Sequence, residues 1–112
     1  MPGYYVLSKN SSNLFHFVLK ADNNEIILTS ETYNSKSGAE NGIKSCQENS
    51  PNDSRYKRET SKASQPYFNL TATNGQIIGT SQMYQSTSGR DNGIASCKLN
   101  GPTKVIKDLT GT

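Results

Sequence analysis

The sequence contains one histidine and two cysteines, and the cysteines do not form a C-x-x-C pair. Clustered metal sites need several such ligands at close spacing, so this composition excludes them. His16 has no nucleophile beside it in a catalytic pattern, and no G-x-x-x-x-G-K-[ST] phosphate loop is present. We therefore expect a protein that is not an enzyme and uses no metal or cofactor, with His16 on the surface.

The chain also lacks an apolar run close to the roughly 20 residues that a membrane-spanning helix needs. Its first nine residues do not resemble a secretory signal, because no apolar segment follows a basic start. These absences predict a cytoplasmic protein with no membrane segment. A net charge of +3 over 112 residues is a far lower charge density than that of a dedicated nucleic-acid-binding domain.

Hydrophobic residues make up only 31% of the chain, and this low share by itself favours disorder. A duplicated pattern argues against disorder, because residues 17–51 match residues 68–102 at 19 of 35 positions without a gap. Two repeats are too few for a solenoid. We predict a single domain over residues 1–112 with pseudo-two-fold symmetry, in which repeat 1 spans about 3–58 and repeat 2 about 54–109.

The second copy carries a family resemblance. The motif A-x-N-G-x-I-I-x-T-S-x-x-Y-x-S runs from Ala72 to Ser86, and N-G-I-x-S runs from Asn92 to Ser96. Together they resemble the YegP-like family of small bacterial proteins of unknown function. The first copy departs from the motif at Asn24, where the family has glycine. The resemblance implies an α+β fold of two β(3)-α-β units that share one sheet and exchange their C-terminal strands, and it implies no activity.

Local patterns predict the same elements in both copies. Alternating apolar residues are typical of strands, and the i, i+4, i+7 spacing of Ala39, Ile43 and Cys46 is typical of a helix with one buried stripe. Ser35 or Ser37 can cap this helix, and Ser37 with Glu40 has the form of a capping box. The second helix is predicted over Thr87–Asn100. The predicted strands are Tyr4–Lys9, Leu14–Ala21, Glu25–Thr29, Asp53–Glu59, Pro66–Thr73, Gln76–Ser81 and Thr103–Leu109, with a tight two-residue turn at Asn74-Gly75.

The strand at Asp53–Glu59 fits two roles, as the end of the first unit or as the start of the second. A unit that ends in an unpaired strand leaves a sheet edge open to another chain. We therefore predict that each repeat donates its end strand to the other within a monomer. The helices are expected on one face of an antiparallel-rich sheet.

Two recurring features could form a ligand site. Asn41-Gly42 and Asn92-Gly93 lie inside the helices, where glycine costs about 0.5–1 kcal/mol relative to alanine. Either the helix packs closely on the sheet there, or the asparagine amide forms a polar binding spot. Serine and tyrosine also recur between strand and helix, where they either complete a turn or bind a ligand. The candidate ligand-binding residues are Ser30, Tyr33, Asn41, Ser81, Tyr84 and Asn92.

Glu31 becomes Gln82 in the second copy, so one copy would lack a carboxylate at this position. Cys46 and Cys97 lie on the predicted buried stripe, where free cysteine behaves as a small apolar residue. A disulfide would need their Cα atoms within about 7 Å, which two helices on separate parts of the sheet do not favour. We expect both thiols to be reduced and buried.

The densest basic segment comprises Arg55, Tyr56, Lys57 and Arg58, followed by Lys62. Basic residues next to tyrosine can bind a phosphate backbone and stack on bases, but charge also protects a sheet edge from aggregation. The sequence therefore predicts an uncharacterised, non-enzymatic binding or interaction module with unknown partners. The alternative is weak nucleic-acid or anion binding through Arg55–Arg58.

Overall fold

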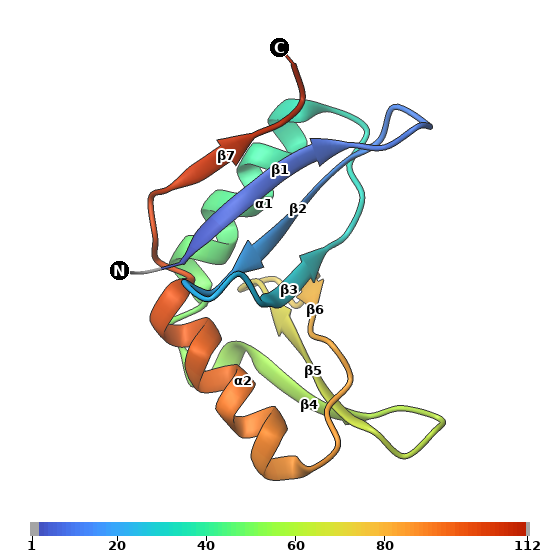
Figure 1. The fold of residues 1–112 in the computed structure, drawn as a ribbon, viewed down its shortest axis with the longest axis vertical. Helices are drawn as coiled ribbons and strands as arrows, with labels where there is room; N and C mark the ends of the chain where they lie inside the picture. The colour runs from blue at the N-terminus through green and yellow to red at the C-terminus, as the bar shows by residue number, and fades with distance from the viewer. Residues whose placement is uncertain (1–2, 112) are drawn as a thin grey trace.

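The computed structural model describes residues 3–111 and contains two helices, α1 (Lys36–Asn49) and α2 (Thr87–Asn100), and one sheet (Figure 1). The strand order across the sheet is β4-β5-β6-β3-β2-β1-β7, and among the described residues only the β1–β7 pair is parallel. The predicted α+β fold with an antiparallel-rich sheet is confirmed. The strands are β1 (Tyr4–Lys9), β2 (Phe15–Lys20), β3 (Ile26–Ser30), β4 (Tyr56–Thr60), β5 (Pro66–Thr71), β6 (Ile77–Thr80) and β7 (Ile106–Asp108).

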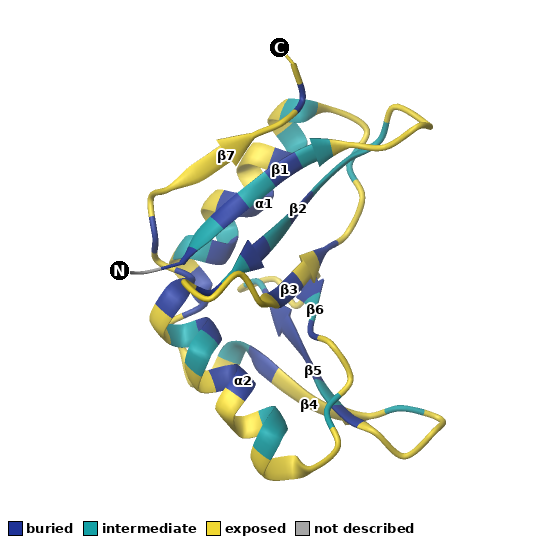
Figure 2. Cartoon of the chain, viewed as in Figure 1, coloured by how far each residue is buried: buried dark blue, intermediate teal, exposed yellow. Residues whose placement is uncertain are grey.

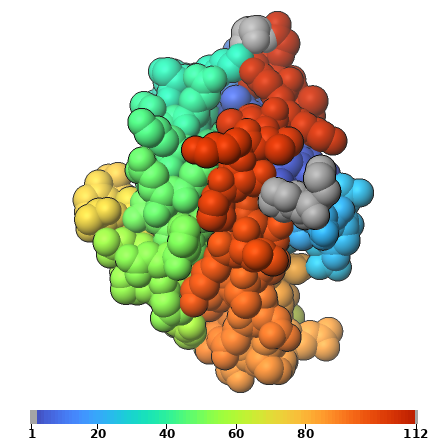
Figure 3. All heavy atoms as spheres, turned by 90° about the vertical axis from the view of Figure 1, so that its left-hand side faces the viewer, coloured from blue at the N-terminus to red at the C-terminus, as the bar shows by residue number. Residues whose placement is uncertain are grey.

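Both helices pack on strands of both repeats. Helix α1 contacts β2, β5 and β6, and helix α2 contacts β5, β3 and β2. Figure 3 shows residues of α1 in green and residues of α2 in orange adjoining over one side of the molecule. The predicted arrangement with the helices on one face of the sheet is confirmed, and the core lies between helices and sheet.

The core is built from alternate residues of the central strands. Phe17 and Leu19 of β2 and Phe68 and Leu70 of β5 are fully buried, as expected for a period of two. Figure 2 shows that burial is concentrated in the inner strands and the sheet-facing side of the helices, while β7 and most of β4 are exposed. The predicted buried stripe of α1 is also correct, because Ala39, Ile43 and Cys46 are at most 1% exposed.

The two repeats exchange their C-terminal strands. Strand β7 follows α2 but pairs with β1, where the Tyr5 amide donates to the Val105 carbonyl (2.9 Å) and the Leu109 amide donates to the Leu7 carbonyl (2.8 Å). Strand β4 follows α1 and pairs with β5. A single strand therefore ends the first unit and begins the second, so that it fills both of the roles predicted for this segment.

Two buried tyrosines tie the repeats together. The Tyr5 hydroxyl donates to the carbonyl of Gly101 at the end of α2, and the Tyr56 hydroxyl donates to the carbonyl of Ser50 at the end of α1, both at 2.6 Å. Burial raises the pKa of both tyrosines above its usual range, so both remain neutral donors. Each first strand thus caps the helix of the other repeat, satisfying a carbonyl that the helix itself leaves without a partner.

Two strands begin three residues later than predicted. Residues Asp53–Arg55 form a 3-10 turn rather than the start of a strand, because the Asn52 side chain accepts a hydrogen bond from the Ser54 amide (3.0 Å). The last strand is confined to Ile106–Asp108, since the Val105 amide bonds to the Thr103 hydroxyl (3.2 Å). In both places a side chain takes a backbone donor that a strand would need.

All four hairpins use the same three-residue loop, which corrects the expected two-residue turn at Asn74-Gly75. In each loop the third residue has a positive φ angle, as in a type I turn followed by a left-handed residue. Glycine adopts this conformation freely and asparagine tolerates it. The four residues are Asn13 (φ 63°), Asn24 (φ 71°), Ser64 (φ 63°) and Gly75 (φ 86°).

Ser64 is the least suited of the four to this conformation. We expect Ser64→Gly to raise the free energy of unfolding by about 0.5 kcal/mol, because relief of left-handed strain exceeds the added entropy of the unfolded chain. Ala63→Gly is the matched control, since Ala63 precedes it in the loop with a negative φ angle. Urea denaturation should show the control to be less stable than wild type; equal stability of the two variants would contradict the prediction.

The exchanged strand is also held by an ion pair. The Lys36 ammonium of α1 lies 2.6 Å from the Asp108 carboxylate of β7. Lys36, together with hydrogen bonds from Thr110, lowers the pKa of Asp108 from 3.8 to about 2. A carboxylate with a lowered pKa stabilises the fold above its unfolded pKa and loses that contribution as the pH falls.

We therefore expect the attachment of β7 to weaken as the pH falls from about 4 to about 2. The protection of the β7 amides against hydrogen exchange, taken relative to the intrinsic exchange rate at each pH, should fall across this range more in the wild type than in Asp108→Asn. An unchanged pH dependence in Asp108→Asn would contradict the prediction.

Candidate functional site

Each helix is capped by a serine that lies two residues after a tyrosine, Tyr33 or Tyr84. The Ser35 hydroxyl accepts a hydrogen bond from the Gly38 amide, and the Ser86 hydroxyl accepts one from the Gly89 amide, both at 3.0 Å. Ser35 was one of the two predicted caps. The capping box of Ser37 with Glu40 was wrong, because the cap lies two residues earlier and the third helical residue is a glycine.

The helical glycines make room for these tyrosines. A Cβ atom added to Gly42 would lie 2.3 Å from the Tyr33 hydroxyl oxygen, and one added to Gly93 would lie 2.1 Å from that of Tyr84. Each tyrosine ring is also stacked on a core phenylalanine, with ring centroids 6.4 Å apart. Close packing therefore accounts for the glycines, but a tyrosine between strand and helix is the main neighbour, rather than the sheet alone.

Ser30 and Ser81 have structural roles. The Ser30 hydroxyl accepts a hydrogen bond from the Phe17 amide (2.8 Å) and donates to the Glu31 carbonyl (2.7 Å). The Ser81 hydroxyl makes the equivalent bonds to Phe68 (3.0 Å) and Gln82 (2.8 Å). Both serines are buried, so the turn alternative fits them better than the ligand-binding one.

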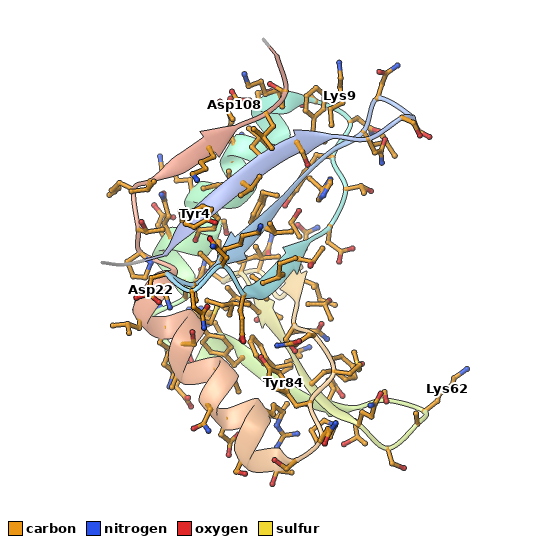
Figure 4. The ribbon with its side chains drawn as sticks, viewed as in Figure 1. Tyr4, Lys9, Asp22, Lys62, Tyr84 and Asp108 are labelled. Carbon is orange, nitrogen blue, oxygen red and sulfur yellow. The ribbon has the colours of Figure 1, made fainter. Side chains whose placement is uncertain are left out.

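Tyr33 and Tyr84 each line a surface cleft that is built from both repeats. The Tyr84 cleft, of about 200 Å³, lies between helix α2 and the β2–β3 hairpin of repeat 1. The Tyr33 cleft, of about 220 Å³, lies between helix α1 and the β5–β6 hairpin of repeat 2. In Figure 4 the labelled Tyr84 lies beside α2, on the side of the helix that faces the strands. The Tyr33 cleft is lined by Tyr33, Gly38, Asn41, Gly42, Ser45, Ala72, Asn74, Gln76, Ile77 and Ile78.

The two clefts are equivalent position by position. Each of the ten residues that line the Tyr33 cleft has its counterpart, 51 positions away, in the lining of the Tyr84 cleft. Nine of these ten pairs are identical, whereas only ten of the other 25 aligned positions are identical. The tenth pair is Glu25 and Gln76. The lining has therefore diverged less than the rest of the duplicated segment.

The acidic groups are arranged so that each cleft region contains one. The Tyr84 cleft contains Glu25 and Gln82. The Tyr33 cleft contains Gln76, and Gln76 also lines an adjoining hollow with Glu31 and Tyr33. The second copy lacks a carboxylate at position 82, as the sequence comparison indicated. The Tyr84 cleft nevertheless contains a carboxylate, that of Glu25. The other repeat supplies it.

The tyrosine hydroxyls are neutral. Burial raises the pKa of Tyr33, and the negative charge of Glu31 raises it further. Burial also raises the pKa of Tyr84; the neighbouring Gln82 side chain works against this rise in pKa, and the charge of Glu25 adds to it. Both carboxylates therefore lie close enough to the tyrosines to act on them electrostatically.

Asn41 and Asn92 present free amides at the clefts. Both residues are exposed, and within residues 3–111 neither side chain forms a hydrogen bond with the protein. The neighbouring serines are engaged: the Ser45 and Ser96 hydroxyls accept hydrogen bonds from Asn49 (3.2 Å) and Asn100 (3.1 Å). The structure therefore brings four of the six predicted ligand-binding residues into the clefts, as two tyrosine–asparagine pairs.

The basic segment does not form the expected surface. Tyr56 is only 6% exposed and donates to Ser50, so it cannot stack on a base. Arg58 contacts the carboxylates of Asp53 (3.3 Å) and Asp91 (3.5 Å), and Arg55 donates to the Asn49 side chain (3.1 Å). Lys57 remains exposed on β4.

Lys62 is also separated from this segment, because it lies at the tip of the β4–β5 hairpin and points away from the body of the protein (Figure 4). The predicted patch of basic residues and tyrosine around Arg55–Arg58 is wrong in its composition, since its aromatic member belongs to the core.

The remaining candidate residues lie outside the clefts. Cys46 and Cys97 are free and buried, as predicted, and burial raises the pKa of Cys97 to about 12. His16 is half-buried on β2, with its Nε2 atom 3.4 Å from the Ser8 hydroxyl. In the part of the chain that the structure describes, no helix is long and apolar enough to cross a membrane.

The family model "Domain of unknown function (DUF1508)" matches residues 10–56 and 61–108, which are the two repeats. The UPF0339 protein of Shewanella oneidensis is 63% identical over 110 residues, covering 98% of this chain and 100% of that protein. The UPF0339 protein YegP of Escherichia coli K12 is 54% identical over 110 residues, with the same coverage.

Two solution NMR structures have the same fold. The structure of a UPF0339 protein from S. oneidensis superimposes with a TM-score of 0.93 at 63% identity, covering 98% of this chain and 93% of that one. The structure of the protein of unknown function YegP from E. coli superimposes with a TM-score of 0.94 at 54% identity, covering 100% and 97%.

Proposed function

The chain belongs to the DUF1508 family of domains of unknown function, and we propose that it is a non-enzymatic binding module with two equivalent ligand clefts. The observation that carries this proposal is the similarity of the cleft linings, which are identical at nine of eleven paired positions when Gln82 and its counterpart Glu31 are included, whereas the repeats match at only ten of the other 24 aligned positions. Packing explains the tyrosines and glycines of the lining. It does not explain Asn41 and Asn92, whose exposed side-chain amides form no hydrogen bond with the protein within residues 3–111.

The chemistry of the clefts favours binding over catalysis. Their titratable groups are a neutral tyrosine and a glutamate, and the tyrosines have raised pKa values, which makes them poor nucleophiles and poor bases at neutral pH. The proposal includes a monomer acting in the cytoplasm. The monomer is supported by the clefts, because both walls of each cleft come from one chain and no second copy is needed to complete the site.

The basic strand is a weaker candidate for function. Nucleic-acid binding through Arg55–Arg58 required tyrosine stacking next to free basic groups, whereas Tyr56 is buried and Arg58 is paired with two carboxylates. We therefore place the function of the protein in the two clefts.

The proposal can be tested by NMR on the full chain, labelled with ¹⁵N and mixed with a small-molecule extract of bacterial cells. We expect shifts at Tyr33, Asn41, Tyr84 and Asn92, because bound molecules would contact both clefts. Asn41→Leu should abolish the shifts around Tyr33 alone. The matched control is Lys44→Gln, an exposed change on α1 outside the Tyr33 cleft.

Extracts that shift only residues outside the clefts, or that shift none, would refute the proposed function. Equal loss of the shifts in Asn41→Leu and in Lys44→Gln would also refute it, since the second residue does not line the cleft.

A further inference from the structure

The clefts differ from the rest of the molecule in the sign of their charge. The chain has 12 lysines and arginines against nine acidic residues. Neither the two clefts nor the hollows that adjoin them are lined by any lysine or arginine, within the described residues. The charged groups in these linings are Glu25 and Glu31. On a protein of net positive charge, the clefts are therefore two local sites of negative potential.

The packing of each helix against the hairpin of the other repeat keeps this pattern in both cleft regions. Glu25 comes from the β2–β3 hairpin, and the corresponding hairpin residue in the other repeat is Gln76. Glu31 precedes helix α1, and the corresponding residue before α2 is Gln82. The two differences compensate, so that each site has one carboxylate and one carboxamide on opposite walls. A ligand that needs one negative charge and a neutral acceptor finds both in the Tyr84 cleft, and finds both in the Tyr33 cleft together with its adjoining hollow, which Glu31 lines.

From this arrangement we propose that each cleft binds a guanidinium group, carried by an arginine side chain or by a small guanidino compound. The proposal rests on the binding function proposed above and specifies its ligand. A guanidinium is planar and carries five N–H donors, which suit a carboxylate together with neighbouring carboxamide and hydroxyl oxygens. In the Tyr84 cleft these acceptors belong to Glu25, Gln82, Asn92 and Tyr84.

The remaining parts of the lining fit the same ligand. Ile26 and Ile27 in one cleft, and Ile77 and Ile78 in the other, provide an apolar wall for the methylene groups of an arginine side chain. A volume of about 200 Å³ suits one side-chain-sized group and is small for a drug-sized molecule, for which clefts of about 300–1,000 Å³ are usual. The rest of the ligand would lie in the adjoining hollow, which is open to solvent.

The test is an NMR titration of the ¹⁵N-labelled full chain with Nα-acetylarginine amide. The neutral isostere Nα-acetylcitrulline amide and the ammonium analogue Nα-acetyllysine amide are the comparison probes. We expect the arginine probe to shift both clefts and the citrulline probe to bind at least about tenfold more weakly, because its hydrogen bonds to the carboxylate lack the charge of the guanidinium. The affinity of a peptide with one central arginine is compared with the affinity of free arginine. The tighter-binding probe shows whether the ligand is a peptide or a free compound.

Four variants assign the charge. Glu25→Gln should abolish shifts around Tyr84 while those around Tyr33 persist, and Glu31→Gln should do the reverse. Gln82→Glu should tighten binding in the Tyr84 cleft, because a second carboxylate is added. Glu48→Gln is the matched control, since it removes an exposed carboxylate of α1 outside both clefts.

The outcomes separate this inference from the proposed function. Equal binding of the arginine and citrulline probes would overturn the guanidinium assignment and leave the clefts as binding sites. Equal binding of the arginine and lysine probes would also overturn it, and would leave the clefts as sites for either cation. No shift in either cleft with the arginine probe would overturn the inference, while the cell-extract experiment would still decide whether the clefts bind anything.

Discussion

Replacing Leu28 by alanine is expected to lower the free energy of unfolding by about 2–5 kcal/mol, the range for removing a buried leucine from a tightly packed core. Leu28 is completely buried on β3, the strand that joins repeat 1 to repeat 2 through β6. Its equivalent in the second copy is Gly79. A Cβ atom added to Gly79 would lie 2.9 Å from the Leu28 Cγ atom and 2.8 Å from the Thr29 carbonyl oxygen.

The physical reason is that the pseudo-two-fold axis passes between β3 and β6. Two equivalent residues that meet at such an axis compete for one volume, so a large residue from one repeat requires a small one from the other. The same relation holds where the helix ends meet, since a Cβ atom on Gly101 would lie 2.0 Å from the hydroxyl oxygen of its equivalent, Ser50. The symmetry of the repeats is therefore broken at the axis.

Gly79→Ala should also destabilise, by about 1–3 kcal/mol, because the added methyl group overpacks the space that Leu28 fills. The double variant Leu28→Ala/Gly79→Ala should lose less than the sum of the single losses, since the shortened side chain leaves room for the new methyl group. Urea denaturation of the four proteins measures this coupling. Leu99→Ala is the control, because Leu99 is 77% exposed. Strictly additive losses would show that the two residues do not share a volume.

The second large effect is expected at the helical glycines. Gly42→Ala should lower the free energy of unfolding by about 1–2 kcal/mol, because the clash costs more than the roughly 0.5–1 kcal/mol that alanine gains in helix propensity. The added Cβ would meet the Tyr33 hydroxyl at 2.3 Å and also the Phe17 Cε2 atom at 2.9 Å. Phe17 is fully buried and cannot move aside.

Gly93→Ala should cost less, because the three atoms nearest to its added Cβ all belong to Tyr84. Tyr84 is only half-buried and can swing outward, which would relieve the clash and disrupt the Tyr84 cleft. Thermal and urea unfolding give the stabilities, and the NMR shifts of the Tyr84 ring report its position. A Gly42→Ala variant as stable as wild type, or a Gly93→Ala variant less stable than Gly42→Ala, would contradict this explanation of the glycines.

The elements were largely predictable because their signals are local. Helix α2 has the expected bounds, Thr87–Asn100, since the serine cap and the spacing of Ile94 and Cys97 both lie within the segment. Strand β1 likewise has the expected bounds, Tyr4–Lys9. The errors at residues 53–55 and 103–105 arose where an asparagine or threonine side chain competes for the backbone, which apolar periodicity does not reveal.

The candidate site was predicted only in part. Tyr33, Tyr84, Asn41 and Asn92 were identified because they recur, but Glu25, Gln76 and the isoleucine pairs were missed. Their signal was present in the alignment of the two copies, as an Ile-Ile doublet after each hairpin turn and as two compensating Glu–Gln differences. Its meaning depends on which hairpin faces which helix.

The sequence alone was enough to predict a duplicated α+β chain. The duplication is visible when the chain is aligned with itself, and apolar spacing can be read along one strand or one turn of helix. Two features follow from the tertiary structure and not from local patterns. Each cleft joins the helix of one copy to the hairpin of the other, and one copy carries leucine where the equivalent position of the other has room only for glycine. Contacts across the pseudo-two-fold axis join residues about 50 positions apart, and no local pattern specifies which of two equivalent partners occupies a shared space.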